Sequence, residues 1–252
     1  MKVICAGLSK TGTKSLAKAL RILGLTVYDH LEHRKFHHKQ WVDLYGEGKL
    51  PDFGHMYEGV DAVIALPVAF WYEEIYAAFP NAKVILSIRD NEDMWVQSWA
   101  KHIEHATTYG GYGALGKVFL DWLVRVFAHK VHILMKSFID PACVAAFGSM
   151  NPKSTVIAKK LYREHNERVQ SVIPKEKLLI YNVKKGWKPL CRFLGCNVPD
   201  QEFPSVNAGL SFAKGQVSTR LQLLKRNIII FLGTSVLIVL LLSFPFLSGI
   251  KN

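Results

Sequence analysis

Apolar residues occur along this chain in two alternating patterns, short continuous runs and longer stretches with helical spacing. The first four-residue run, Val3–Ala6, is followed by apolar positions at Leu16, Ala19, Leu20 and Leu23, which is the spacing of one helix face. Such strand and helix patterns predict strands at 3–6, 25–28, 61–66, 84–88 and 175–181 and helices at 13–23, 37–45, 67–79, 91–98, 117–139, 154–172 and 186–195. The glycine-rich segment 102–116 predicts a mobile loop between two of these helices. The alternation predicts an α/β domain.

The link between the first strand and the first helix is bounded by Gly7 and Gly12. A strand, a glycine-bounded loop and a helix N-terminus together present backbone N–H groups to one anion. Lys10 and Lys14 add positive charge. Hydroxyl groups come from Ser9, Thr11, Thr13 and Ser15. The segment therefore predicts a phosphate-binding loop.

The spacing of this loop differs from that of a nucleoside triphosphatase. That motif places a Lys directly after the second glycine, whereas this chain has Thr13 there and Lys14 one residue later. A shift of one residue rotates a side chain by about 100° around the helix. The strand at 84–88 also ends in Arg89 and Asp90 rather than in a lone Asp for Mg²⁺. A P-loop kinase remains an alternative that Mg²⁺-dependent ATP binding would favour.

The charge and the C-terminal hydropathy point to an anionic partner and to a membrane. Of the net charge of +12, residues 1–213 carry +7, because five basic residues and no acidic residue follow Ala213. This surplus suits a polyanionic ligand or an acidic membrane surface, and no nucleic-acid recognition motif accompanies it. Ile228–Leu247 contains 20 residues without a charge, which is enough to cross the hydrocarbon of a bilayer. We therefore expect a domain at 1–207, a basic linker at 208–226, a transmembrane helix at 227–247 and a short tail at 248–252.

The motif Ser-Lys-Thr-Gly-Thr-Lys-Ser at 9–15 resembles the 5′-phosphosulfate loop of P-loop sulfotransferases. These enzymes take a sulfuryl group from 3′-phosphoadenosine 5′-phosphosulfate (PAPS), and no metal is needed. The resemblance implies an open parallel sheet flanked by helices. It also implies that Lys10 stabilises the leaving group, and that residues 9–15 hold the 5′-phosphate.

Two later motifs extend the resemblance as far as residue 207. In sulfotransferases an Arg at the end of a strand and a Ser eight or nine residues later grip the 3′-phosphate, which Arg89 and Ser98 match. A guanidinium fork suits a phosphate, although Arg89 could instead pair with Asp90 or Asp93. The segment Lys184-Lys185-Gly186-Trp187 is similar to the family's segment that closes the nucleotide site. Trp187 would stack on adenine, and the two lysines would lie near phosphate charge.

The acceptor side of the site is less clearly indicated. The family places a His and an acidic residue after the second strand, which His30 and Glu32 match. His30 is the first candidate for a general base, because its ordinary pKa is near neutral, and Glu32 is the second. Ala65 stands where many members have an Asp two residues before Pro67. A membrane-tethered nucleotide-binding adaptor without catalysis is therefore a further alternative to a sulfotransferase acting on a small or lipid-like hydroxyl or amine.

Charge flanking the apolar C-terminal segment predicts its orientation. Lys225 and Arg226 precede it directly, and only Lys251 follows it. Basic flanks stay on the cytoplasmic side, so we expect a tail-anchored protein with its catalytic domain in the cytosol, provisionally at the endoplasmic reticulum. The four cysteines show no metal spacing and suit a reducing compartment.

Overall fold

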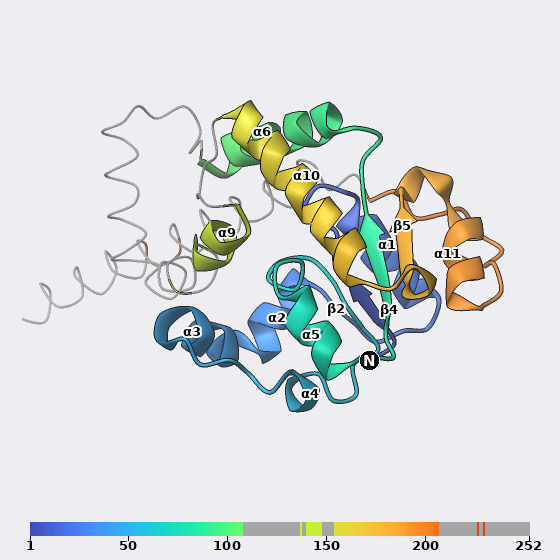
Figure 1. Ribbon diagram of the computed structural model, residues 1–252, viewed down its shortest axis with the longest axis horizontal. Coiled ribbons are helices and arrows are strands. Elements are labelled where there is room, and N and C mark those ends of the chain that lie inside the picture. Colours follow the sequence, from blue (N-terminus) through green and yellow to red (C-terminus); the bar gives the residue numbers. More distant parts are fainter. Residues whose placement is uncertain (108–136, 138–139, 148–153, 207–225, 227–228, 230–252) are drawn as a thin grey trace, which may run out of the picture.

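The computed structural model describes residues 1–107, 137, 140–147, 154–206, 226 and 229 (Figure 1). The strands are β1 (Val3–Cys5), β2 (Val27–Tyr28), β3 (Ala62–Val63), β4 (Lys83–Ser87) and β5 (Leu178–Tyr181). They form a five-stranded sheet in the order β2-β3-β1-β4-β5, and every neighbouring pair is parallel. The register places Val3 opposite both Ala62 and Lys83, so β1 lies at the centre of the sheet. The predicted α/β fold with an open parallel sheet is confirmed.

Helices cover both faces of the sheet. Successive residues of a strand point to opposite faces, so a strand of consecutive apolar residues needs packing partners on both. Ile4 and Ala6 pack against α3 (His38–Glu47), α4 (Phe53–Met56), α5 (Tyr72–Ala78) and α10 (Thr155–Val172). Val3 and Cys5 pack on the other side against α1 (Thr13–Ile22) and α11 (Trp187–Leu194). This two-sided burial explains the continuous apolar run at the start of the chain, since a strand buried on both faces does not alternate.

A third apolar cluster lies beyond the end of the central strand. Leu8 of the loop after β1 packs with α6 (Glu92–Thr107), α9 (Asp140–Phe147) and α10. At its centre Trp95 stacks on Tyr162 with ring centroids 4.6 Å apart and on Trp99 at 6.0 Å. The aromatic rings therefore hold α6 and α10 against the glycine-bounded loop.

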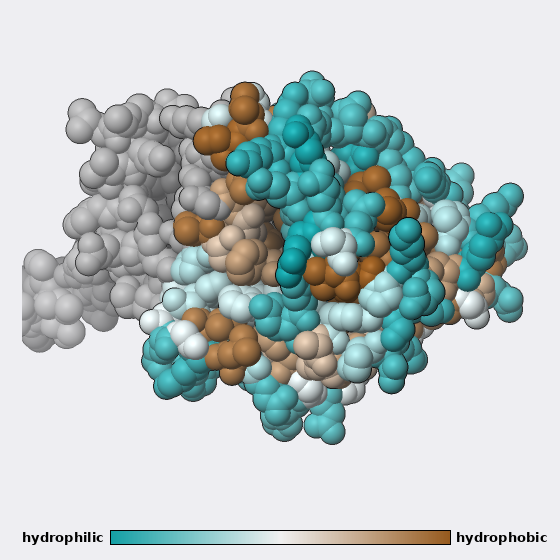
Figure 2. Space-filling view, viewed as in Figure 1, coloured by the Kyte–Doolittle hydropathy of each residue, from teal (hydrophilic) through white to brown (hydrophobic). Residues whose placement is uncertain are grey.

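The side of α10 that faces away from the core carries charged residues, and the helical spacing separates them from the buried ones. Ala158, Tyr162 and Val169 are buried, while Arg163 and Arg168 are exposed and pair with Glu92 and Glu73 on neighbouring helices. Figure 2 shows a hydrophilic surface along this helix, with hydrophobic residues at its N-terminal end, where Val156 and Ile157 are exposed. The helix is thus one wall of the domain, with ion pairs at its rim.

Several element boundaries differ from those that the hydropathy pattern predicts. The expected loop from residue 102 is wrong up to Thr107, because α6 continues to that residue. The helix expected from Pro67 begins only at Tyr72, after a turn that starts at Ala65, which has a φ of 71°. The helix expected at 37–45 is α3, and an additional helix that the pattern did not predict, α2 (His30–Phe36), precedes it and meets it at His37. The helix predicted at 117–139 lies, apart from Ser137, outside the described residues.

The predicted membrane segment also falls mainly outside the residues that the structure describes. Of Ile228–Leu247 only Ile229 is described, and it is helical. Among the residues that the structure describes, no helix combines the length and the apolar character needed to span a bilayer.

Candidate active site

The loops that follow the strands meet at one edge of the sheet. Since all strands are parallel, their carboxyl ends lie on the same side, which is where open α/β sheets bind ligands. β1 leads into the loop from Gly7 to Gly12, β2 into His30, and β4 into Arg89. β5 leads into a 3₁₀ turn at Val183–Lys185 and then into α11. The structure therefore brings the three predicted motifs to one edge of the sheet.

The start of the loop is packed tightly against β4. A Cβ added to Gly7 would lie 2.0 Å from the Ser87 Oγ and 2.7 Å from the Ser87 backbone nitrogen and oxygen. Thr11 is fully buried, and its hydroxyl donates to the Leu8 carbonyl at 2.6 Å. Because that hydroxyl has a single proton, Ser87 is the donor in the 2.6 Å contact between the Ser87 and Thr11 hydroxyls. The Thr11 hydroxyl therefore fixes the loop internally, and binding of the 5′-phosphate by Thr11 stays a prediction.

Lys10 occupies the tip of this loop in an unusual conformation. Its φ is 74°, in the left-handed region that few non-glycine residues adopt. Burial, together with the adjacent Arg89 guanidinium, lowers the pKa of Lys10. Backbone strain and neighbouring charges of like sign are both unfavourable in free energy. Such features cluster at functional sites.

Arg89, at the end of β4, is held at the same place by contacts with the loop and with α10. Its Nε donates to the Lys10 carbonyl at 2.7 Å, and its backbone N–H donates to the Tyr162 hydroxyl at 3.0 Å. The alternative surface pairing of Arg89 is not seen, since Asp90 pairs with Lys184 and Asp93 pairs with Lys159. The guanidinium is thus tied to the loop tip instead of to the neighbouring acids.

The predicted partner of Arg89, Ser98, lies on α6 close to the loop. Trp95 donates its indole N–H to the Ser9 carbonyl at 2.9 Å. Ser98 follows Trp95 by three residues, so the two lie on the same side of the helix, and Ser98 is half-buried. Ser98 is thus on the part of α6 whose Trp95 contacts the loop, and its role as a partner of Arg89 stays a prediction.

The end of the loop forms the N-terminus of α1. Gly12 is its N-cap with a φ of 94°, and an added Cβ would lie 2.6 Å from a Val183 methyl group. The first helical hydrogen bond runs from Leu16 N–H to Gly12 C=O, so the N–H groups of residues 13–15 precede the ladder. Helix α1 has no side-chain cap and no acidic residue in its first turn. These N–H groups form a site for an anion of the kind that the loop pattern predicts.

Two of the loop's hydroxyl residues are nearly enclosed. Thr13 and Ser15 are both buried, and the Ser15 hydroxyl oxygen accepts the Val206 backbone N–H at 3.0 Å. Ser15 thereby fastens the end of the described domain across α1. Its own O–H proton remains available for a further acceptor.

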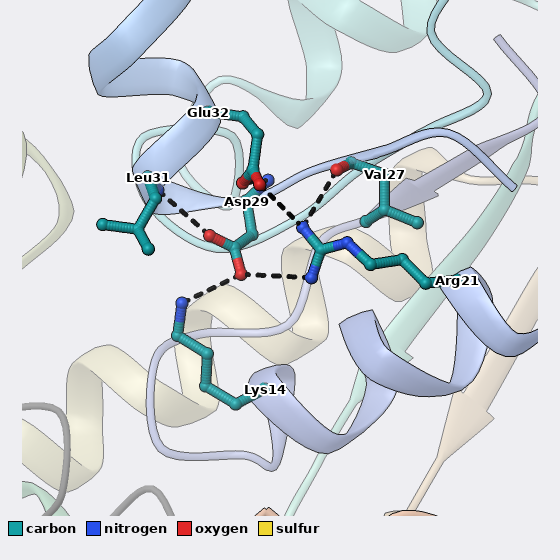
Figure 3. Close-up of polar contacts among 6 residues, drawn as sticks. All are labelled: Lys14, Arg21, Val27, Asp29, Leu31 and Glu32. Atoms are coloured by element: carbon teal, nitrogen blue, oxygen red, sulfur yellow. Dashed lines mark hydrogen bonds and ion pairs between the residues drawn. The ribbon is translucent and has the colours of Figure 1, made fainter.

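Lys14 points away from the loop and into a buried ion pair. Its Nζ lies 2.9 Å from the Asp29 Oδ2 (Figure 3). Burial opposes the charge on Asp29, but the Lys14 ammonium, the Leu31 N–H and the Arg21 guanidinium outweigh it and hold the pKa at about 2. The direct phosphate contact expected of Lys14 is therefore replaced in this structure by a contact with Asp29.

Glu32 is occupied in the same network. One of its oxygens accepts the Asp29 backbone N–H at 3.0 Å, and the other accepts from Arg21 at 3.1 Å. With Asp29 accepting the Leu31 N–H, the pair forms a complete capping box at the start of α2. Glu32, the second expected base, is thus engaged through one oxygen in the capping box of α2 and through the other in the contact with Arg21.

His30 is the first residue of α2 and lies between these charges and the turn at Leu66. Its imidazole makes a hydrogen bond with the Leu66 backbone. Burial, followed by the nearby Lys14 ammonium, lowers the pKa of His30 to about 4. The neutral imidazole is therefore the resting form at physiological pH, which is the form that can accept a proton.

Two further histidines on this segment belong to an aromatic core. His33 is fully buried between Tyr57, Trp41 and Tyr28, with ring centroids 5.8–6.4 Å away. Burial, together with the neighbouring His30 and His37, lowers the pKa of His33 to about 3. His37 packs on Tyr28 and Tyr57 at 5.6 and 5.4 Å. These side chains anchor α2 beneath His30.

The third motif closes the site from the side of β5. Gly186 has a φ of 65° and precedes α11, and Lys185 is exposed beside it. Lys184 pairs with Asp90, which also accepts from Asn182 at 2.7 Å. Trp187 is only 7% exposed, packs edge-on against Phe203 at 5.0 Å, and donates to the Gln201 carbonyl at 2.8 Å. Stacking of Trp187 on adenine is therefore corrected, because the indole is part of the core.

Comparison with known proteins identifies the family. The family model for the sulfotransferase domain matches residues 2–212. The chain belongs to the sulfotransferase family. It is similar to a protein of Aspergillus versicolor named "Ava biosynthesis cluster protein M", with 31% identity over 224 residues, which cover 82% of this chain and 80% of that protein.

In this member of the family, Ala65 stands where the resemblance leads us to expect an Asp. It is buried, it has a positive φ, and its carbonyl accepts the Ala69 N–H at 3.0 Å. The Ala65 side chain is a methyl group, so it lacks the carboxylate that an Asp would provide here. His30, which bonds the backbone of the next residue, is thus the titratable group that the structure places against this turn.

Several residues of the sulfotransferase site were missed from the sequence. Asp29 carried a usable signal, since Asp29-x-x-Glu32 is a capping-box pattern, but Glu32 was interpreted as a catalytic group. Ser87 and Tyr162 have no such signal in the sequence. Ser87 contacts Thr11 and Tyr162 contacts Arg89, and the two residues of each pair are more than 70 positions apart in the chain. Among the described residues, no group of three or more His, Cys, Asp or Glu side chains is arranged to hold a metal.

Proposed function

We propose that this sulfotransferase moves a sulfuryl group from PAPS to a hydroxyl or amine of a small-molecule or lipid-like acceptor. The sulfotransferase domain supports the transfer reaction. The name of the Aspergillus versicolor relative refers to a biosynthesis cluster, which is consistent with a small-molecule acceptor.

The observation that carries the proposal is the placement of Lys10 and Arg89. Two cationic side chains from loops about 80 residues apart are held together, although their repulsion contributes to lowering the pKa of Lys10. An anion bound between these two side chains would interact favourably with both charges. A donor with phosphates at both the 5′ and 3′ positions supplies that anion.

The 5′-phosphosulfate and the 3′-phosphate of the donor each have suitable hydrogen-bond donors and cations in this proposed site. The N–H groups at the start of α1 and the Lys10 ammonium suit the 5′-phosphosulfate. The Arg89 guanidinium and the Ser98 hydroxyl suit the 3′-phosphate, with one donor fork and one further O–H. Lys185, exposed beside Gly186, adds positive charge on the side of β5.

In the transfer step the donor supplies a sulfuryl group whose bond to the bridging phosphate oxygen breaks as the bond to the acceptor forms. Lys10 stabilises the negative charge that develops on the bridging oxygen, and the α1 N–H groups stabilise the phosphate. This stabilisation is strongest in the transition state, so Lys10 acts mainly on the rate of the chemical step.

The acceptor proton must leave as the new bond forms, and His30 is our proposed base. Its imidazole is neutral before the reaction and lies at the same sheet edge as the loop. Anionic phosphates bound at the start of α1 would partly offset the positive charge that depresses the pKa of His30, which improves its basicity when the donor is bound. Glu32, which caps α2 and pairs with Arg21, is the second candidate for this base.

A non-catalytic nucleotide-binding adaptor is the second candidate, and Ala65 favours it. An adaptor would bind the nucleotide through the same groups but would not turn over. The experiment that separates the two is release of adenosine 3′,5′-bisphosphate from PAPS by the full-length protein, measured by mass spectrometry with panels of phenols, alcohols and amines.

Two lysine variants serve as controls in this assay. Lys10→Ala should abolish release, whereas Lys39→Ala, on the exposed side of α3, should leave it unchanged. Stoichiometric sulfated product supports the transferase. Nucleotide binding without product from any acceptor class supports the adaptor.

We further propose that Ile228–Leu247 anchors the protein in a membrane with residues 1–213 in the cytosol. The support is its uncharged 20-residue composition and the basic residues Lys225 and Arg226 before it. Alkaline carbonate extraction with protease protection tests this. A resistant pellet whose N-terminal domain is digested without detergent supports the anchor, and release of the full-length chain contradicts it.

A further inference from the structure

The buried carboxylate of Asp29 joins the two halves of the proposed site. It is 5% exposed and binds groups of two elements. From α1, Lys14 donates to its Oδ2 at 2.9 Å and Arg21 lies 3.8 Å from the same oxygen. From α2, the Leu31 N–H donates to its Oδ1 at 3.0 Å. One side chain thus fixes the helix behind the phosphate loop relative to the helix that begins with His30 (Figure 3).

The charges around His30 give Asp29 a second role. The groups that act on the imidazole are the Lys14 ammonium from α1, the Arg34 guanidinium from α2, the Leu66 backbone from the turn after β3, and the Asp29 carboxylate. The cations oppose protonation of the imidazole, whereas Asp29 favours it. A base must carry the acceptor's proton as an imidazolium, so an anion beside this base lowers the cost of that state.

We propose that Asp29 is a positioning residue that holds His30 at the phosphate loop and offsets the Lys14 charge, so that the imidazole can take up a proton. The inference rests on the proposed function for its role in sulfuryl transfer. The coupling between Asp29 and His30 is a property of the protein itself and can be measured without turnover.

The Asp29→Asn substitution separates charge from capping. Asn is as good an N-cap as Asp, so α2 keeps its start while the carboxylate charge is lost. Lys14→Met removes the opposing cation of the same pair. A matched control is Asp43→Asn, because Asp43 pairs with Lys39 on α3, away from this network.

The readout is the protonation of His30, followed by NMR of ¹³C-labelled histidine in the full-length chain from pH 7 to well below the pKa of this imidazole. The His30 resonance is assigned by its loss in His30→Gln. We expect Asp29→Asn to shift its titration to lower pH, and Lys14→Met to shift it to higher pH. Asp43→Asn should leave the curve unchanged.

The opposite signs distinguish electrostatic coupling from structural damage, which would move both variants in the same direction. Unchanged titration in both folded variants, or shifts of the same sign, would overturn the inference. If Asp29→Asn does not fold, Asp29→Ser replaces it as a second uncharged N-cap: a downward shift supports the coupling and no shift contradicts it.

Turnover then tests the proposed function separately. With a working acceptor, Asp29→Asn should lower kcat at least tenfold while the affinity for adenosine 3′,5′-bisphosphate changes less than threefold. Wild-type protein that shows the coupling but no turnover refutes the transferase and retains the inference. Turnover without the coupling refutes the inference and retains the transferase.

Discussion

The Nε of Arg89 donates a hydrogen bond to the backbone carbonyl of Lys10 at 2.7 Å. This single contact connects the end of β4 to the tip of the loop after β1. It leaves the terminal nitrogens of the guanidinium for other acceptors. The proposed reader of the 3′-phosphate and the proposed stabiliser of the leaving group are therefore parts of one unit.

Removing the Arg89 side chain should weaken nucleotide binding selectively. Hydrogen bonds to charged groups are worth about 1.5–3 kcal/mol, so Arg89→Ala should reduce the affinity for adenosine 3′,5′-bisphosphate by about 10- to 150-fold in calorimetric titrations. Adenosine 5′-phosphosulfate, which has no 3′-phosphate, should lose much less. Arg163→Ala, which removes an arginine paired with Glu92 on the surface, is the matched control. Equal losses for both nucleotides would exclude Arg89 as the reader of the 3′-phosphate.

Gly7→Ala should disrupt the loop, because the new Cβ would overlap backbone atoms of Ser87 that cannot move independently. Overpacking of this kind costs about 1–3 kcal/mol or more. Gly46→Ala is the control, since Gly46 lies in α3 with no atom within 4 Å of an added Cβ. There the free energy of unfolding should rise by up to about 1 kcal/mol. Denaturant titration measures both, and an equally small effect at Gly7 would contradict the packing described.

The positive φ of Lys10 predicts a difference between two substitutions that both remove its charge. Lys10→Gly should be more stable than Lys10→Ala by about 0.5–1 kcal/mol, because only glycine adopts the left-handed region without strain. Both variants should lose turnover. Chemical unfolding gives the stability difference, and a more stable alanine variant would show that the loop tip is not strained.

Stability should fall as the pH drops below about 6, because the unfolded chain binds more protons than the folded one. The pKa of His33 is about 3 in the folded state and about 6.5 when unfolded, so this side chain alone should contribute a slope of about 1.4 kcal/mol per pH unit between those values. His33→Phe should flatten the slope while keeping a ring in the aromatic core. His55→Gln is the exposed control. A slope equal to that of the wild type in His33→Phe would assign the effect to other groups.

The sequence predicts the strands, the loop and Arg89 well because local patterns determine them. Val3–Ala6 and the glycines around Lys10 show their roles through hydropathy and spacing alone. The end of α6 is not predicted well, because the glycine-rich segment that begins at residue 102 fits either a loop or a helix, and α6 (Glu92–Thr107) extends into it.

Side-chain partners could not be predicted in the same way. Lys14 was expected to contact phosphate by its position, but its direction on α1 brings it to Asp29, and only the folded packing of α1 on β2 and α2 shows this. Trp187 was expected at the nucleotide, yet the crossing of Phe203 over α11 encloses it. Both differences arise from contacts between elements, which hydropathy does not encode.

The central claim is most directly tested by calorimetric titration of the full-length protein with adenosine 3′,5′-bisphosphate, adenosine 5′-monophosphate and ATP–Mg²⁺. The placement of Lys10 beside Arg89 predicts that one adenosine 3′,5′-bisphosphate binds per chain, about tenfold or more tightly than the monophosphate that lacks the 3′-phosphate. Binding of ATP–Mg²⁺ without binding of adenosine 3′,5′-bisphosphate would contradict the account and favour a kinase.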